Sequence, residues 1–191
     1  VATRPPGPKS KLADVAAMML GAVPYSLYAT LPAVQIVPQL DNADTRIAIT
    51  ERAFLPQLLQ ARALHPALRT IVVLEGDGGA DTLPWSAVER DDDAIDLGAA
   101  AATVQPDDLA TIVYTSGTTG PAKGVELTHR GLVAAVRTNR YLLGRPPDRR
   151  FLSWLPTAGM AERITSHYLP LVDGGTVVYC DDPRRAAEAL T

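Results

Sequence analysis

The sequence contains a single cysteine, Cys180, and aromatic residues make up only 5% of its 191 residues. One cysteine excludes an internal disulfide and is typical of a protein from a reducing compartment. Long apolar runs are also missing. The best candidate, residues 12–23, contains Asp14 and ends before Pro24, well short of the roughly 20 residues that span a bilayer. We therefore expect a cytoplasmic protein without a transmembrane segment, for which any membrane contact is peripheral.

An excess of positive charge is absent too, since the formal net charge is −3 at pH 7. Without a basic excess, nucleic acid is excluded as an expected partner. Neither His65 nor His167 has a cysteine, histidine or carboxylate at metal-ligand spacing, so we expect no metal site. Lysine is rare: the chain has fifteen arginines but three lysines, and Lys123 is the only one after Lys11. This isolation marks Lys123 as a candidate functional residue.

What the sequence does have is a high apolar content, 47%, arranged in short runs between helical patterns. The apolar runs predict strands at 23–28, 46–50, 70–74, 109–114, 125–128, 151–155 and 176–180. The patterns between them predict helices at 11–20, 32–40, 54–64, 84–89, 130–143, 160–172 and 183–190. Ser10 is the expected N-cap of the first helix. Strands joined by helical crossovers indicate the α/β class, with mostly parallel sheets covered by helices on both faces.

We expect two units along the chain. Residues 1–104 form part of a first α/β subdomain and end in a solvated linker at 90–104. Residues 105–191 form part of a second α/β subdomain.

One stretch, residues 112–125, combines hydroxyls, glycines and a lysine directly after a buried strand. The hydroxyls supply hydrogen-bond donors, the glycines let backbone N–H groups face an anion, and the lysine adds a positive charge. Because it follows an apolar strand, this loop belongs at the carboxyl end of a sheet, where open α/β folds bind ligands. A polyphosphate suits this set best. The candidate ligands to it are Thr115, Ser116, Gly117, Thr118, Thr119, Gly120 and Lys123.

The loop is not a Walker A motif, which requires glycine directly before the lysine and a hydroxyl residue directly after it. Here Ala122 precedes Lys123 and Gly124 follows it. The residues after the loop also read as a strand, whereas a P-loop leads into a helix. The kinase and GTPase classes are therefore excluded.

The stretch resembles the phosphate-binding signature of the adenylate-forming, or AMP-binding, superfamily of acyl-activating enzymes. That signature reads roughly Y-T-S-G-[ST]-T-G-x-P-K-G-V-x-x-[ST]-H, and residues 114–129 agree at twelve or more positions, with Ala122 in place of the proline. The resemblance implies that residues 115–120 and Lys123 hold the β- and γ-phosphates of ATP. Lys123 and Thr119 are then the expected catalytic residues, which stabilise charge as pyrophosphate leaves.

Two other segments resemble the long-chain fatty acid–CoA ligases within this superfamily. Residues 151–171 are similar to their L-P-[LMS]-A-H-x-x-E-R and Y-x-P-L motifs, and residues 13–28 to A-x-x-G-A-[VI]-x-x-[GP]-[LI]-Y. By this resemblance Gly159, Glu162 and Arg163 lie near the acid substrate, with Gly159 replacing the usual histidine. The adjacent Glu-Arg pair also fits an ordinary surface or salt-bridged pair. For His129, a packing role at a helix start and a role near phosphate remain equally open.

The resemblance implies a two-step reaction. A fatty acid and ATP give acyl-adenylate and pyrophosphate, and the thiol of coenzyme A then displaces AMP, with Mg²⁺ acting in the complete enzyme. Because the family's enzymes are longer, we expect an internal part of the N-terminal domain, without the C-terminal domain, inactive alone and partnered by the remainder of the enzyme. Two alternatives stay open: a fatty acyl–AMP ligase that loads a carrier protein, and a truncated or split-gene product without catalysis.

Overall fold

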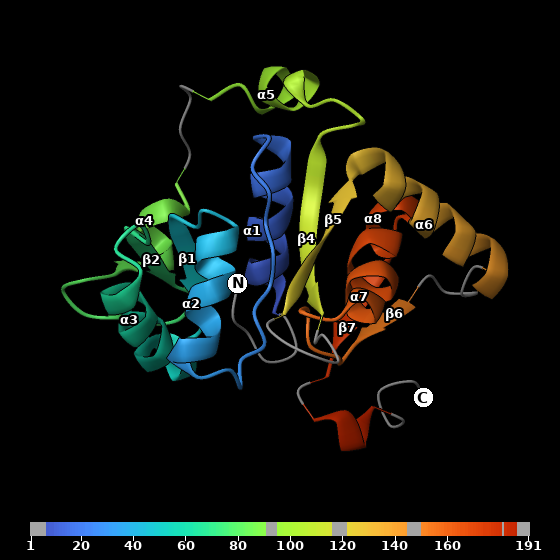
Figure 1. Cartoon of the computed structure of the whole chain (residues 1–191). Coiled ribbons are helices and arrows are strands. Elements are labelled where there is room, and N and C mark those ends of the chain that lie inside the picture. Colours follow the sequence, from blue (N-terminus) through green and yellow to red (C-terminus); the bar gives the residue numbers. More distant parts are fainter. Residues whose placement is uncertain (1–6, 91–94, 116–121, 145–149, 181, 187–191) are drawn as a thin grey trace.

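The structure is a computed structural model that describes residues 7–90, 95–115, 122–144, 150–180 and 182–186. Figure 1 shows two groups of helices and strands with helix α1 (Pro8–Met19) between them and helix α5 (Leu97–Thr103) above. The paired strands form three small sheets, two of which are parallel. The α/β class with mostly parallel pairing is thereby confirmed.

The first group is built on a parallel sheet in the order β1-β2-β3. Its strands are β1 (Ile47–Thr50), β2 (Thr70–Val73) and β3 (Leu83–Pro84). Its helices are α2 (Ala33–Asn42), the 3₁₀ turn Arg52–Phe54, α3 (Leu55–Leu64) and α4 (Trp85–Val88). The apolar run of β2 is buried along the strand, as a strand covered on both faces requires.

The second group contains one hairpin and one parallel pair. β4 (Leu109–Thr115) and β5 (Lys123–Thr128) pair antiparallel, and α6 (His129–Leu143) follows directly. β6 (Arg150–Ser153) pairs in parallel with β7 (Thr176–Tyr179). The crossover between them comprises α7 (Met160–Glu162), the π-helical segment Arg163–Tyr168 and α8 (Leu169–Asp173), and the 3₁₀ turn Pro183–Arg185 comes last.

Two hydrophobic cores support these groups. The first lies between α2, α3 and the β1–β2 pair, and the second lies between α6, β6 and the π-helical segment. Tyr114 of β4 belongs to the first core, although it comes after residue 104. Side chains from both sides of the expected boundary between residues 104 and 105 therefore pack in the same core.

Several local predictions are wrong. Residues 23–28 form isolated bridges, among them Tyr25 with Ile112, because Pro24 has no N–H to donate to a continuous ladder. The expected linker contains α5, since its alanine run favours a helix and Asp96 caps it by accepting from the Ala99 N–H. Helix α1 starts at Pro8 rather than at residue 11, and Ser10 donates its hydroxyl to the Gly7 carbonyl instead of capping.

The helix predicted at 160–172 is interrupted by the π-helical segment Arg163–Tyr168. The helix predicted at 183–190 is a 3₁₀ turn over Pro183–Arg185, and residues 187–190 lie outside the described part of the chain. The remaining helices and strands match their predictions to within a few residues.

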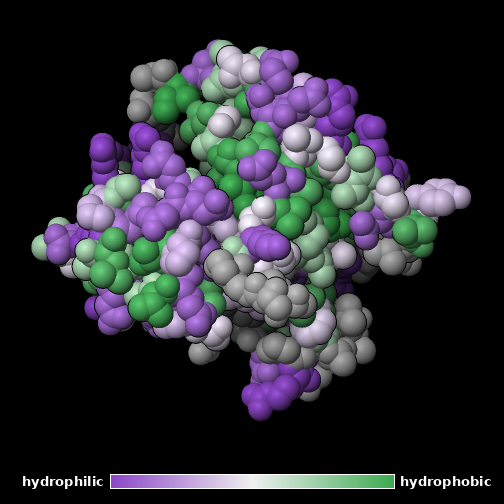
Figure 2. All heavy atoms as spheres, viewed as in Figure 1, coloured by the Kyte–Doolittle hydropathy of each residue, from purple (hydrophilic) through white to green (hydrophobic). Residues whose placement is uncertain are grey.

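Apolar surface remains exposed over the centre of the face on which α1 and β4 lie (Figure 2). Large apolar side chains with exposed fractions of 45% or more include Leu12 of α1, Leu20 directly after α1, and Val125 of β5. An open groove of about 650 Å³ lies between α1, α5 and α6, lined by Met18, Val104 and Val133 among others. Exposed apolar area of this kind is typical of surface that contacts another segment or protein.

Candidate functional site

The hairpin β4–β5 carries the two ends of the predicted phosphate-binding loop. Thr115 at the end of β4 pairs with Lys123 at the start of β5, and the Thr115 hydroxyl donates to the Lys123 carbonyl at 3.4 Å. Both residues are exposed. The predicted ligands between them, Ser116, Gly117, Thr118, Thr119 and Gly120, lie outside the described residues. The hairpin therefore places the exposed residues Thr115 and Lys123 opposite each other, and the Lys123 ammonium can donate to an anion.

Tyr114 anchors the hairpin next to this end. Its hydroxyl lies 2.7 Å from the Asn42 side-chain oxygen and 3.1 Å from the Gln39 carbonyl, both on helix α2. Its ring packs edge-on against Tyr25 with the ring centroids 5.3 Å apart. Burial raises the pKa of Tyr114, so the hydroxyl stays protonated and can donate. These contacts hold the strand that leads to Thr115 against the first group.

Gly124 completes the anchor, because it pairs with Tyr114 across the hairpin. A Cβ atom at this position would lie 2.9 Å from the Ile112 methyl group and 3.3 Å from the Tyr114 ring. Glycine is thus required here by close packing. The third glycine of the motif, Gly124, therefore shapes the stem of the hairpin, next to the lysine.

His129 lies at the other end of β5 from Lys123, and this separates it from the predicted phosphate site. Helix α6 begins there, and the Thr128 hydroxyl caps it by accepting from the Gly131 N–H at 3.1 Å. His129 lines the open groove beside α1, and its backbone N–H donates to the Asp108 carbonyl. Of the two roles left open for His129, the structure supports packing at the helix start.

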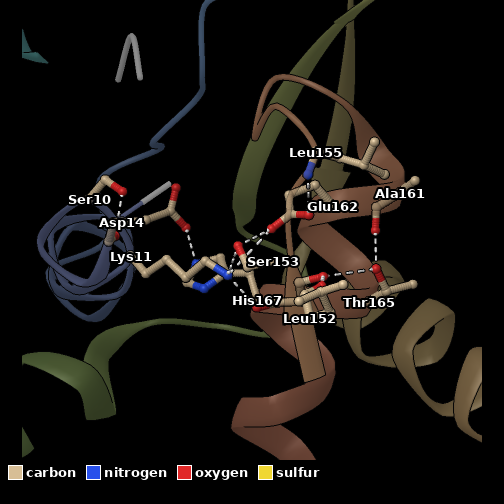
Figure 3. Close-up of polar contacts among 12 residues, drawn as sticks. Ser10, Lys11, Asp14, Leu152, Ser153, Leu155, Ala161, Glu162, Thr165 and His167 are labelled. Atoms are coloured by element: carbon tan, nitrogen blue, oxygen red, sulfur yellow. Dashed lines mark hydrogen bonds and ion pairs between the residues drawn. The ribbon is translucent and has the colours of Figure 1, made fainter. Parts of the chain in front are cut away.

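A second cluster of charged groups is buried between α1, β6 and the crossover helix (Figure 3). Glu162 is only 1% exposed and accepts from the Ser153 hydroxyl at 2.5 Å and from the Leu155 N–H at 3.2 Å. The Lys11 ammonium lies 3.5 Å from the same carboxylate. Burial lowers the pKa of Lys11, and the attraction of Glu162 offsets part of that effect. Glu162 is therefore a paired, buried anion.

Arg163 occupies the adjacent part of the cluster and is also 1% exposed. Its guanidinium donates to Asp14 at 2.7 Å, to the Tyr168 hydroxyl at 2.6 Å and to Ser26 at 3.0 Å. His167 lies 3.0 Å from the other oxygen of Asp14. Burial alone would raise the pKa of Asp14, but the hydrogen bond from His167 and the charge of Arg163 outweigh it and lower the value to about 2. Asp14 is therefore ionised at neutral pH.

Of the three predicted acid-site residues, only Gly159 leaves room for a neighbouring group. A Cβ built there would lie 3.4 Å from the Pro156 carbonyl and 3.8 Å from the Tyr28 hydroxyl, which are ordinary contacts. Gly159 has an extended backbone that other residues also adopt. Glu162 and Arg163, by contrast, direct their charges at protein groups. The salt-bridged interpretation of this pair is the one that the structure supports.

Sequence reasoning missed Asp14, Lys11 and His167 as members of this cluster. Their partners lie 142 to 155 residues away along the chain, so no local spacing could connect them. One signal was available. Lys11 and Asp14 are charged residues three positions apart, on one face of a helix whose last five residues are all apolar, and charged residues are rarely buried unless they are paired.

Among the described residues, no group of three or more histidine, cysteine, aspartate or glutamate side chains could hold a metal ion. Within the same residues, no helix is both long and apolar enough to cross a membrane. Cys180 is buried and contacts the Asp182 carbonyl.

Comparison with known proteins defines the class to which this arrangement belongs. Residues 4–191 match the AMP-binding enzyme family, so the chain belongs to that family. Solved structures share the fold over nearly all of the chain. The luciferase-like enzyme of the mealworm Zophobas morio has a TM-score of 0.84 at 19% identity, covering 99% of this chain and 43% of its own. ATP-bound MatB from Rhodopseudomonas palustris has a TM-score of 0.72 at 21% identity, and the match covers 98% of this chain and 36% of MatB.

The curated relatives include acid–CoA ligases. A putative fatty-acid–CoA ligase, fadD11, from Mycobacterium tuberculosis is 41% identical over 98 residues, which are 51% of this chain and 17% of that protein. Long-chain-fatty-acid–CoA ligase 1 from Homo sapiens is 31% identical over 159 residues, 72% of this chain and 22% of that protein. 4-Coumarate–CoA ligase-like 4 from Oryza sativa is 34% identical over 148 residues, which are 76% of this chain and 27% of that protein. The matched part of the chain thus spans about a sixth to a quarter of these relatives' length.

Proposed function

We propose that this chain is part of an ATP-dependent enzyme that activates a long-chain fatty acid, first to acyl-adenylate and then to acyl-CoA. The family membership and the fatty-acid–CoA ligases among its relatives support the reaction class. One structural observation supports the assignment of particular residues. In the β4–β5 hairpin the exposed residues Thr115 and Lys123 pair with each other at the two ends of the hydroxyl- and glycine-rich segment.

In the first step, a carboxylate oxygen of the acid forms a bond to the α-phosphorus of ATP. The bond from that phosphorus to the bridging oxygen breaks, and pyrophosphate leaves with the electron pair. The hydroxyls of Thr115, Ser116, Thr118 and Thr119, the backbone at Gly117 and Gly120, and the Lys123 ammonium bind the β- and γ-phosphates and neutralise charge on the leaving group. In the second step, the thiolate of coenzyme A attacks the acyl carbon and AMP leaves.

The residues at the ends of the hairpin fit a polyphosphate. The Lys123 ammonium offers donors and no acceptor, and the Thr115 hydroxyl can exchange its 3.4 Å hydrogen bond to the Lys123 carbonyl for one to a phosphate oxygen. Mg²⁺ belongs to the proposal as a charge-neutralising ion on ATP, but the described residues offer no cluster for it, and no step is assigned to it. We place the acid near the loop after β6, where Gly159 carries no side chain and the Tyr28 hydroxyl lies 3.8 Å from the position that a Cβ atom would occupy. The enzyme is proposed to act in the cytoplasm.

The experiment that tests the assignment replaces Lys123 in the whole protein in which this chain occurs. Lys123→Ala removes a charge-assisted contact worth about 1.5–3 kcal/mol, so fatty-acid-dependent ATP–pyrophosphate exchange should fall about 10- to 100-fold. Fatty-acid binding, measured by calorimetry, should change less than twofold. Lys123→Arg tests whether positive charge alone is sufficient at this position.

The control is Arg46→Ala, which removes another exposed cation, on the turn before β1 and paired with Asp44. It should leave exchange at the wild-type rate. Exchange that is unchanged in Lys123→Ala, or a loss of equal size in Arg46→Ala, would contradict the assignment of Lys123 to phosphate.

A further inference from the structure

The carboxylate of Glu162 is fully engaged by protein groups. One oxygen accepts from the Ser153 hydroxyl and lies 3.5 Å from the Lys11 ammonium, while the other accepts from the Leu155 N–H. Figure 3 shows Lys11 reaching from α1 toward the side chains of Ser153 and Glu162. With 1% of its surface exposed, Glu162 has no free face to offer a substrate. Any effect on a substrate must therefore pass through the groups that it holds.

The groups that it holds define one loop, residues 155–159, between β6 and α7. Glu162 fixes the first residue through the Leu155 N–H. The last residue, Gly159, donates its N–H to the Pro156 carbonyl at 3.0 Å and accepts from the Arg163 N–H at 3.3 Å. The loop leaves the carboxyl end of β6, the end at which open α/β folds bind ligands.

The helix that carries Glu162 is itself unusual. It widens into six π-helical residues, Arg163–Tyr168, directly after Glu162. Such segments are rare and are frequently found at functional sites. Here the widened turn places Arg163, His167 and Tyr168 together on Asp14 of α1. The crossover helix is thereby tied to α1 by two buried pairs, Arg163–Asp14 and Glu162–Lys11.

We propose that Glu162 is a positioning residue for the acid substrate. It sets the position of the 155–159 loop, with Lys11 neutralising its charge, and does not contact the substrate itself. This inference rests on the proposed acyl-activating function. It predicts that a substitution at Glu162 weakens binding of the acid more than binding of ATP. The hairpin that carries Thr115 and Lys123 is anchored separately, through the contacts of Tyr114 with α2.

The test measures steady-state kinetics of the whole protein with Glu162→Gln. The KM for the fatty acid should rise about tenfold, because the uncharged amide holds the loop less firmly, while the KM for ATP and kcat at saturating acid stay within twofold. Amide hydrogen exchange at Leu155 should accelerate in the same variant. A glutamate that directly contacted the fatty-acid carboxylate would give the opposite result, since removing its charge would relieve repulsion and lower that KM.

Because Glu162→Gln leaves the buried Lys11 without its counter-charge, Ser153→Ala serves as a milder second variant. It removes no charge, but it removes the hydroxyl that donates to Glu162 and accepts from the Lys11 ammonium at 3.2 Å, and it should raise the KM for the acid about threefold. The matched control is Asp173→Asn, which removes a nearly buried carboxylate from the same crossover, paired with Arg140. It should lower the unfolding temperature without changing the KM for the acid.

The inference is overturned if folded Ser153→Ala and Glu162→Gln leave the KM for the acid unchanged, or raise the KM for ATP equally. It is also overturned if Asp173→Asn has the same effect as these variants. A wild-type protein without acid-dependent exchange refutes the proposed function instead. Leu155 exchange still reports on the loop in that case, and unchanged exchange in Glu162→Gln refutes the positioning role separately.

Discussion

At the scale of single residues, the most heavily constrained side chains are the buried charges that join α1 to the crossover helix. Asp14, Arg163 and Glu162 are each 5% exposed or less, and each has an opposite charge within 3.5 Å. Burying such charges is costly, and they are tolerated only when paired and hydrogen-bonded. Their contribution to specific positioning therefore matters more than any contribution to net stability.

The paired state of Asp14 predicts an acid-sensitive part of the folding free energy. Its pKa is about 2 in the folded chain against an ordinary value of 3.8, so its contribution is complete above pH 3.8 and is lost as the pH falls toward 2. The difference corresponds to about 2 kcal/mol. Urea unfolding between pH 5 and pH 2 should show this loss, and ¹³C NMR of the Asp14 carboxyl should follow it. An Asp14 carboxyl that titrates near pH 4 would contradict the prediction.

At the scale of elements, the hairpin shows how a short motif determines a local structure. The apolar runs of β4 and β5 lie on either side of the glycine-rich segment in the sequence, so both strands could be predicted. The antiparallel pairing that makes these strands a hairpin was outside that prediction. The structure adds the reason for Tyr114 and Gly124, whose packing depends on α2, more than seventy residues away.

A substitution at Gly124 tests this packing. Gly124→Ala would place a Cβ atom 2.9 Å from Ile112, so the stem must shift, and we expect a loss of about 1–3 kcal/mol in the free energy of unfolding measured in urea. The matched control is Gly131→Ala in helix α6, where the nearest contact is 3.4 Å and alanine favours the helix. The control should be neutral or stabilising. Equal stabilities for the two variants would show that Gly124 is not closely packed.

Other elements were less predictable, for physical reasons that differ. The expected strand at 23–28 was read from apolar residues, but Pro24 removes a ladder donor. Helix α5 was not predicted because the residues that flank it in the sequence are mostly polar, although Asp96 and the alanines at 99–102 favour a helix. The cluster around Asp14 and Glu162 depends on tertiary contacts alone. Local patterns therefore predict the two strands of the hairpin better than they predict the buried cluster between α1 and the crossover helix.

At the scale of the whole molecule, the chain combines two cores with an exposed apolar face. The cores explain why nearly the full length superimposes on longer enzymes of the same fold. The apolar surface over α1 and β5, together with the open groove beside α6, offers contact area that the described residues do not cover. We expect the chemistry to require the longer polypeptide that the relatives have, because the chain spans only about a sixth to a quarter of their length.

The central claim is that these residues belong to a fatty-acid-activating enzyme. Its most direct test is mass-spectrometric detection of acyl-adenylate after the whole protein is incubated with ATP, Mg²⁺ and a long-chain fatty acid, without coenzyme A. The account predicts acyl-adenylate, its conversion to acyl-CoA when coenzyme A is added, and no product from the 191 residues alone. If the acyl group is transferred to a carrier protein but not to coenzyme A, the enzyme is a fatty acyl–AMP ligase and the second step of the proposal is wrong. Absence of acyl-adenylate with every long-chain acid tested would contradict the claim.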